Sequence, residues 1–162
     1  MNATPIVPFG CLYRWTSCTP NPAAQARATL RRALSQLGLH SESISDGVLA
    51  ASELVANATE HALGPYELHL RRIVDALLCE VLDHDPRIPV LAEFPSTAPF
   101  AARPRGCGGG LDALLELLSE RGRGLHIVHE LTCGVWGFRA FNNGTKIAWL
   151  ALPLPGGTYD AC

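Results

Sequence analysis

The stretch ELVANATEHA, Glu53–Ala62, carries two patterns along one predicted helix. Apolar residues recur at alternating four- and three-residue steps, the spacing of a helix face that packs on a core. These residues are Ile44, Val48, Ala51, Val55, Ala58 and Ala62. Glu53, Asn57 and His61 follow one another at i, i+4 spacing on a different side of the helix. The helix therefore combines a core face with a separate polar stripe.

The polar stripe has two interpretations. A rise of about 1.5 Å per residue separates Glu53 from Asn57 by about 6 Å along the axis, and one hydrated cation or one phosphate group fits that gap. Asn is also a poor choice inside a helix, which favours a functional reason for Asn57. A solvated face with hydrogen-bonding pairs explains the same residues, and on this helix alone it is the favoured interpretation.

The segments around this helix predict a sheet with helices on one face. Helical spacing predicts a first helix over residues 23–37, and the second runs from Ser41 or Ser43 to about Leu63. Alternation of apolar and polar residues predicts strands elsewhere. The predicted strands are residues 11–18 at an edge, a hairpin of 66–73 and 76–83 that turns at about Asp75, and a final pair, 135–140 and 145–152. This order predicts an α+β two-layer sandwich with a mainly antiparallel sheet.

The regular patterns stop between residues 85 and 121. Five prolines followed by GCGGG predict a long loop, and long ordered loops in compact domains are usually functional. A short amphipathic helix, Leu111–Leu118, falls within this loop. A last helix is predicted from about Leu125 to Cys133, introduced by the glycines of RGRG. We expect a single domain over residues 1–162, with the loop as a mobile lid over a pocket.

Composition excludes several classes of protein. The chain has 162 residues, of which 48% are hydrophobic and 17% charged, as in folded globular domains. No apolar run is long enough for a membrane span, and the absence of a secretory signal predicts a cytoplasmic protein. A net charge of −2 disfavours direct nucleic-acid binding. The six cysteines form no CxxC pair, which disfavours zinc and predicts free thiols, most of them in the core.

Two predicted strands carry polar residues where they end or begin. Asp83 continues the apolar face of its strand. A carboxylate there either caps a turn or accepts hydrogen bonds from a ligand in a largely apolar pocket. After the turn NNG, Thr145 and Lys146 begin the last strand, where a plain hairpin with a surface lysine is the simpler interpretation.

The segment RGRG precedes the last predicted helix. Gly122 and Gly124 permit close backbone approach, and a helix N-terminus offers unpaired N–H groups to an anion. Arg121 and Arg123 add positive charge beside them. A single G-x-G is a weak signal, because glycines before helices are common.

Taken in order, these pieces resemble a known family. They are E-x-x-x-N-x-x-x-H, a strand ending in Asp83, G-x-G before a helix, and G-T before a strand. The set is similar to the ATP-binding fold of gyrase, heat-shock chaperones, histidine kinases and mismatch-repair ATPases, called the GHKL or Bergerat fold. Within it, the chain most resembles the small bacterial anti-sigma-factor serine kinases. The resemblance runs from Ala23 to Leu152.

The resemblance implies that ATP and Mg²⁺ are the ligands. Asn57 would hold Mg²⁺ between the phosphates, and Glu53 would act as base towards an attacking hydroxyl. Asp83 would accept a hydrogen bond from the adenine amino group, and Thr145 would support the adenine end. His61 matches the motif, although it could equally cap its helix. Hard cations prefer oxygen ligands, which suits these residue types.

For the phosphates, the resemblance implies a cradle of backbone groups. Gly122, Gly124 and the neighbouring Leu125 would approach them, with Arg121 and Arg123 beside them. Phosphoryl transfer depends mainly on positioning and charge neutralisation, and such a cradle contributes to both.

The family implies a protein serine kinase that phosphorylates a small antagonist protein and binds a sigma factor, with a homodimer as one arrangement. The alternative is an ATP-gated switch without kinase activity, and a plain interaction domain is a third possibility. Glu53 and Asn57 together favour the kinase, because a pure binder needs no base. Asp85, followed by Pro86, replaces the glycine usual after the adenine-binding Asp, and this favours the switch.

Overall fold

The computed structural model describes residues 10–89 and 120–156, with side chains in the second part from Arg123 onward. Within these ranges the helices and strands follow one another in the order that the sequence predicts. In chain order they are β1 (Gly10–Trp15), α1 (Pro22–Gln36), α2 (Ser41–His61), β2 (Tyr66–Ile73), β3 (Ala76–Asp83), α4 (Glu120–Leu131), β4 (Trp136–Ala140) and β5 (Lys146–Pro153).

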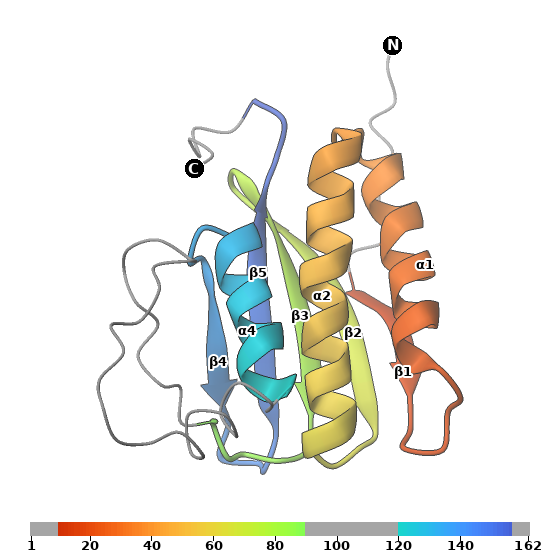
Figure 1. Cartoon of the computed structure of the whole chain (residues 1–162), viewed down its shortest axis with the longest axis vertical. Helices are drawn as coiled ribbons and strands as arrows, with labels where there is room; N and C mark the ends of the chain where they lie inside the picture. The colour runs from red at the N-terminus through yellow and green to blue at the C-terminus, as the bar shows by residue number, and fades with distance from the viewer. Residues whose placement is uncertain (1–9, 90–119, 157–162) are drawn as a thin grey trace, which may run out of the picture.

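The strands form one antiparallel sheet in the order β1-β2-β3-β5-β4. The helices α1, α2 and α4 lie side by side on one face of this sheet (Figure 1). The predicted α+β two-layer sandwich is therefore confirmed, as are the β2–β3 hairpin and the position of β1 at an edge. None of the helices in the described ranges is both long and apolar enough to cross a membrane.

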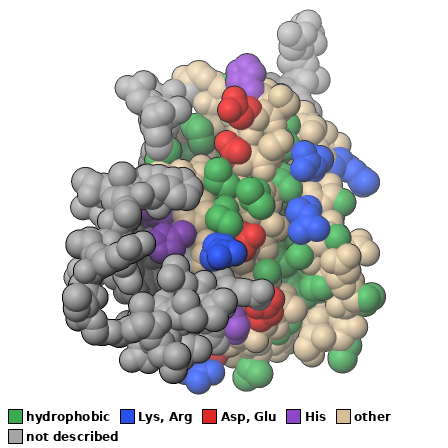
Figure 2. All heavy atoms as spheres, in the orientation of Figure 1, with side chains coloured by type: hydrophobic (Ala, Val, Ile, Leu, Met, Phe, Trp, Pro, Cys, Tyr) green, Lys and Arg blue, Asp and Glu red, His purple; other side chains and the backbone are tan. Residues whose placement is uncertain are grey.

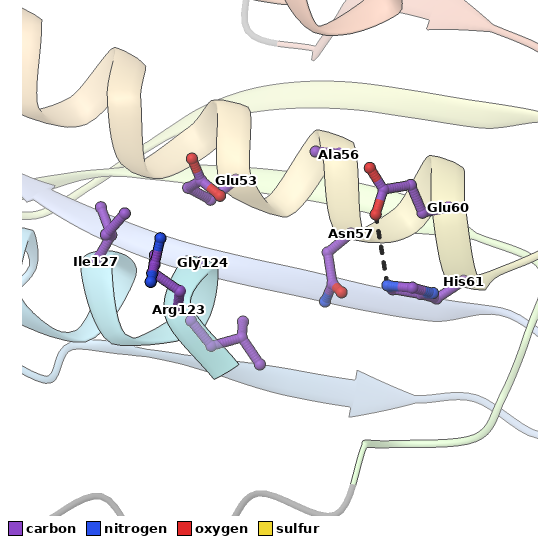
Figure 3. A pocket seen from close by; sticks show the side chains of 9 residues that line it. Glu53, Ala56, Asn57, Glu60, His61, Arg123, Gly124 and Ile127 are labelled. Carbon is purple, nitrogen blue, oxygen red and sulfur yellow. Dashed lines mark ion pairs between the residues drawn. The ribbon is translucent and has the colours of Figure 1, made fainter. Parts of the chain in front are cut away.

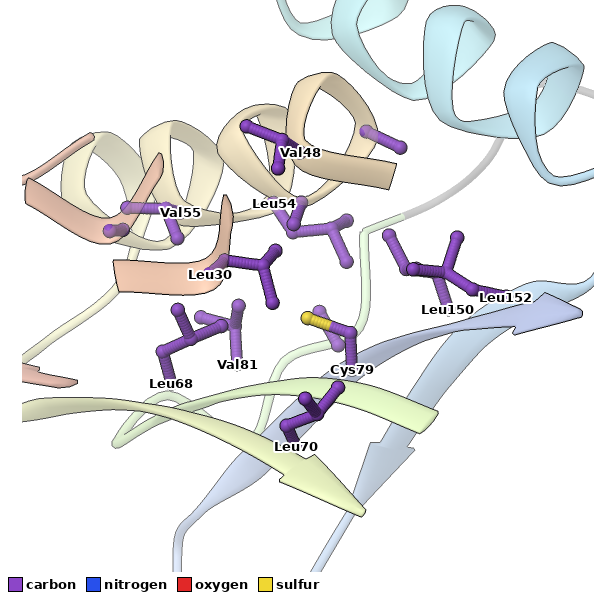
Figure 4. Close-up of a cluster of buried hydrophobic side chains, with 14 of the residues drawn as sticks. Leu30, Val48, Leu54, Val55, Leu68, Leu70, Cys79, Val81, Leu150 and Leu152 are labelled. Carbon is purple, nitrogen blue, oxygen red and sulfur yellow. The ribbon is translucent and has the colours of Figure 1, made fainter. Parts of the chain in front are cut away.

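The core lies between α2 and the inner face of the sheet (Figure 4). The apolar stripe of α2 is buried as predicted from Ile44 to Ala58. Strand alternation turns Leu68 and Leu70 of β2 towards the same core. Burying a Leu or Val side chain contributes roughly 1.5–3 kcal/mol, so this shared core fixes α2 over the sheet.

The C-terminal end of α2 is tied to the β2–β3 hairpin. The Tyr66 hydroxyl donates a hydrogen bond to the carbonyl of Ala62 (2.9 Å). The His84 backbone N–H donates to the carbonyl of Leu63 (2.8 Å), and its ring Nδ1 contacts the carbonyl of Pro65 (2.8 Å). These bonds hold the last turn of α2 beside the end of β3, where Asp83 lies.

Charged side chains occupy the outer surface of the helices. Figure 2 shows Lys and Arg side chains gathered over α1, where Arg27, Arg31 and Arg32 are exposed, and acidic side chains over α2. Figures 1 and 2 have the same orientation. The two helices therefore present different charges to solvent on the face that the figure shows.

Three expectations from the sequence are wrong. The last helix begins at Glu120, and not after RGRG, so Gly122 and Gly124 lie inside α4. Glycine lowers helix stability by about 1 kcal/mol relative to Ala, but packing against α2 overrides that preference. Cys133 forms a disulfide, whereas Cys11, Cys18 and Cys79 are free thiols as expected. Of these three thiols only Cys79 is buried, so the expected core position is wrong for Cys11 and Cys18. Spacing along the chain cannot show which cysteines meet in space.

The predicted helix Leu111–Leu118 lies outside the described residues, and so does most of the predicted lid loop. Residues 84–89 at its start contain no helix or strand, as expected there. The lid itself stays a prediction.

Candidate functional site

A cavity opens where α2, α4 and the ends of β3 and β5 meet. It has two adjoining parts of about 250 and 260 Å³, and Asn57, His61 and Leu125 line both of them. The first part lies between α2 and α4 (Figure 3), and the second lies over the end of the sheet. The other residues that line the first part are Glu53, Ala56, Glu60, Arg123, Gly124 and Ile127. The second part is lined further by Leu54, Ala58, Ala62, Asp83, Asp85, Arg87, Ile88, Pro89, Phe138, Lys146 and Ala148.

The polar stripe of α2 lines the first part of this cavity. Glu53 and Asn57 are half-buried, because α4 packs beside α2 on that side. Asn57 and Arg123 project into the space between the two helices (Figure 3). His61 stands at the end of the stripe, 3.6 Å from Glu60. The stripe is therefore the wall of a cavity and not an open solvated face.

Glu53 lies in an environment that favours its neutral form. Partial burial raises the pKa of its carboxyl, the negative charge of Glu60 raises it further, and Arg27 opposes both effects. Gly124 of α4 passes so close that a Cβ atom there would lie 2.7 Å from Oε2 of Glu53. A carboxyl with a raised pKa is a better proton acceptor near neutral pH, which suits a general base.

Asp83 closes the other end of the cavity and is only 1% exposed. Its Oδ1 accepts a hydrogen bond from the backbone N–H of Asp85 (2.9 Å), and its Oδ2 lies 3.4 Å from Nζ of Lys146. Burial raises the pKa of Asp83, while the Asp85 hydrogen bond and the Lys146 charge lower it in part. Asp83 therefore caps a turn and also lines the cavity, and its role towards a ligand stays a prediction.

Lys146 is a residue that the sequence interpretation missed. It is only 6% exposed, and not the surface lysine that the hairpin predicted. Its ammonium donates to the carbonyl of Arg87 (3.0 Å) and lies 5.9 Å from the centre of the Phe138 ring. Alternation along β5 is the sequence signal that could have indicated the burial of Lys146, because Lys146 shares the inward face of the strand with Ala148 and Leu150.

The chain directly after β3 is fixed by an ion pair. Arg87 Nε donates to Asp85 Oδ1 (2.8 Å), and its Nη2 donates to Oδ2 (2.6 Å). This bidentate contact holds the pKa of Asp85 well below its usual range. Both residues line the second part of the cavity, and the pairing was not foreseen.

The remaining predicted site residues are placed differently. Arg121 and Gly122 lie in the first turn of α4, where backbone N–H groups have no partner within the helix. Gly124 and Leu125 line the cavity from the second turn. Thr145 does not line the described cavity: its backbone N–H and hydroxyl donate to Oδ1 of Asn143 (3.1 and 2.6 Å). The binding roles of these residues stay predictions.

The family of the chain follows from comparison with known proteins. The sequence model of the histidine kinase-like ATPase domain matches residues 16–149, well over half of the chain. The chain therefore belongs to the histidine kinase-like ATPase domain family, and it is an ATP-binding domain. A comparison with curated proteins finds no match.

The cavity suits ATP in its chemistry. Around Asp83, apolar side chains such as Leu54, Ala58 and Phe138 offer walls for a nucleobase. Nearer α4, Arg123 and the first helical turn favour negative charge, as phosphates require. The Asn57 amide lies between these two regions and can supply an oxygen ligand to Mg²⁺.

Proposed function

We propose that the protein is an ATP-dependent protein serine/threonine kinase that phosphorylates a small antagonist protein and controls a sigma factor by binding it. The carrying observation is that one cavity holds Glu53 with a raised pKa, Asn57 and Asp83. A protein that only bound nucleotide would not need Glu53, whereas phosphoryl transfer to a hydroxyl requires a proton acceptor.

In this mechanism Asp83 accepts a hydrogen bond from the adenine amino group, and the phosphates lie towards the first turn of α4. Asn57 would hold Mg²⁺, which would supply neutralisation of phosphate charge. The hydroxyl of the target Ser or Thr gives its proton to Glu53. The hydroxyl oxygen then bonds to the γ-phosphorus as the bond between that phosphorus and the β–γ bridging oxygen breaks, which leaves ADP.

The proposed partners are a sigma factor and its antagonist protein. This function places the protein in the bacterial cytoplasm, where ATP and sigma factors occur together, and a homodimer is compatible with it. The family membership and the cavity support the nucleotide part of this proposal. The partners come from the resemblance of the motifs to anti-sigma-factor kinases.

A second candidate is an ATP-gated binding switch without kinase activity. It is favoured by the Asp85–Arg87 ion pair, which fixes the chain where the related kinases have a glycine. A more rigid segment beside the pocket for the adenine ring would allow nucleotide binding to change the protein surface without supporting rapid phosphate transfer.

The decisive experiment measures transfer of labelled phosphate from ATP to candidate antagonist proteins, beside nucleotide titrations with and without Mg²⁺. Wild type should label one antagonist, and Glu53→Gln should not. Glu42→Gln, on the first turn of the same helix and away from the cavity, is the matched control and should retain transfer. If wild type binds Mg·ATP yet labels no antagonist, the switch replaces the kinase.

A further inference from the structure

We infer that Lys146 reads the nucleobase together with Asp83: its ammonium donates a hydrogen bond to the ring nitrogen N1 of adenine, while Asp83 accepts one from the adjacent amino group. The pair would thereby select adenine over guanine. This inference rests on the proposed binding of ATP in the cavity, and it assigns base specificity to a second residue.

Asp83 and Lys146 form an ion pair at the closed end of the cavity. They lie directly opposite each other in the register of β3 and β5. Both side chains point to the helical side of the sheet, and their charged atoms are 3.4 Å apart. Each lines the second part of the cavity, among apolar side chains. A ligand that enters this part therefore meets an acceptor and a donor side by side.

The Lys146 ammonium is held in place and keeps one N–H donor available for a ligand. An ammonium has three N–H donors. Among the residues that the structure describes, its acceptors are Asp83 and the carbonyl of Arg87. The ring of Phe138 at 5.9 Å adds a cation–π contact that further fixes the ammonium. One N–H is left for a ligand, on a group that is already oriented.

The pattern of donor and acceptor matches adenine. The Watson–Crick edge of adenine places the amino donor next to the N1 acceptor, so the amino group can face Asp83 while N1 faces Lys146. Guanine in the same pose would set its O6 acceptor against Asp83 and its N1–H against Lys146. Both contacts would be repulsive, so guanine would bind more weakly than adenine. Two well-placed contacts to a base edge discriminate by about 10- to 100-fold.

Lys146 has an alternative role that makes the opposite prediction. It could only neutralise Asp83 and occupy the place of the amino group in the free protein. The adenine would then have to displace it, so removal of the ammonium would strengthen ATP binding. A donor to N1 would weaken binding on removal. The direction of the change in affinity therefore separates the two roles.

The experiment titrates the full chain with ATP, GTP and 1-deaza-ATP, in which a C–H group replaces N1, in the presence of Mg²⁺. Wild type should bind 1-deaza-ATP and GTP about 10- to 100-fold more weakly than ATP. Lys146→Met keeps a long side chain without donors, and it should bind ATP and 1-deaza-ATP equally weakly. Arg139→Met, at an exposed position of β4, is the control for loss of one positive charge and should behave as wild type.

Each result decides one point. Equal affinity of wild type for ATP and 1-deaza-ATP, or tighter ATP binding by Lys146→Met, would overturn the role of Lys146 while leaving ATP binding intact. Failure of folded wild type to bind ATP at all would instead overturn the proposed function, and this inference with it. If Lys146→Met does not fold, the comparison of ATP with 1-deaza-ATP on wild type still tests the contact.

Discussion

Gly124 of α4 lies against the carboxylate of Glu53 on α2, and a Cβ atom at Gly124 would come within 2.7 Å of Oε2. The contact joins the two helices that enclose the first part of the cavity. It explains why a glycine stands inside a helix, where Ala is the better helix former. The absence of a side chain at Gly124 therefore leaves room for the Glu53 carboxylate in its present position.

The first prediction concerns Gly124→Ala. The added methyl group meets the far end of a flexible side chain, so the fold should tolerate it and the carboxylate should move. Helix propensity favours Ala by about 0.5–1 kcal/mol, so the melting temperature should not fall. Phosphate transfer should fall at least tenfold, by displacement of the base. Unchanged transfer at unchanged stability would show that the position of Glu53 does not matter.

The second prediction separates the base from the metal ligand. Glu53→Gln keeps size and polarity but cannot take up the hydroxyl proton. It should retain Mg·ATP binding and lose transfer by on the order of 10² to 10⁴. Equal activity of wild type and Glu53→Gln would remove the base role.

The third prediction applies the same titrations to Asn57→Ala. This variant removes an oxygen ligand and should weaken Mg·ATP binding, with a smaller effect on metal-free nucleotide. Asn57 lies off the core stripe, so thermal unfolding should be close to that of wild type. Equal weakening with and without Mg²⁺ would argue that Asn57 contacts the nucleotide and not the metal.

The fourth prediction tests adenine recognition through Asp83→Asn. The Asn oxygen can still accept the Asp85 N–H, so the turn after β3 should persist. The carboxylate that would accept from the amino group is lost, which should weaken ATP binding by about 1–3 kcal/mol in a calorimetric titration. Asp46→Asn on α2, which does not line the cavity, serves as control. Unchanged affinity in a folded Asp83→Asn variant would contradict the assignment.

The periodicity of the sequence predicted those parts of the site that lie within a single helix or strand. The periodicity of α2 separated the stripe of Glu53 and Asn57 from the core face, because both patterns belong to one helix. Alternation likewise brought Asp83 to the inner face of β3. Such features depend only on the repeat of their own helix or strand.

The features that pattern missed depend on contacts between distant segments. The start of α4 was misplaced because its glycines are tolerated through packing on α2. Alternation along β5 could have indicated the burial of Lys146, but not its contact with Arg87, 59 residues away in the chain, or its register with Asp83. No repeat within β5 specifies either partner, so the donor beside the acceptor became visible only in three dimensions.

The last prediction concerns the dependence on pH that Glu53 imposes. Burial raises the pKa of this carboxyl, so the folded protein favours its neutral form more than the unfolded chain does. The resulting stabilisation is fully present below the ordinary Glu value of about 4.3, and it is lost as pH rises through the raised pKa. Glu53→Gln stays neutral throughout.

The variant should therefore unfold at a temperature no lower than wild type at pH 7, and the difference should vanish below about pH 4, near the ordinary Glu value. Phosphate transfer by wild type requires ionised Glu53. The pH below which the transfer rate falls should therefore be higher than it would be for an exposed Glu. The control variant Glu42→Gln should show the same pH dependence of phosphate transfer and of stability as wild type. A Glu53→Gln protein that is less stable than wild type at pH 7 would show that the folded state favours the charged carboxylate.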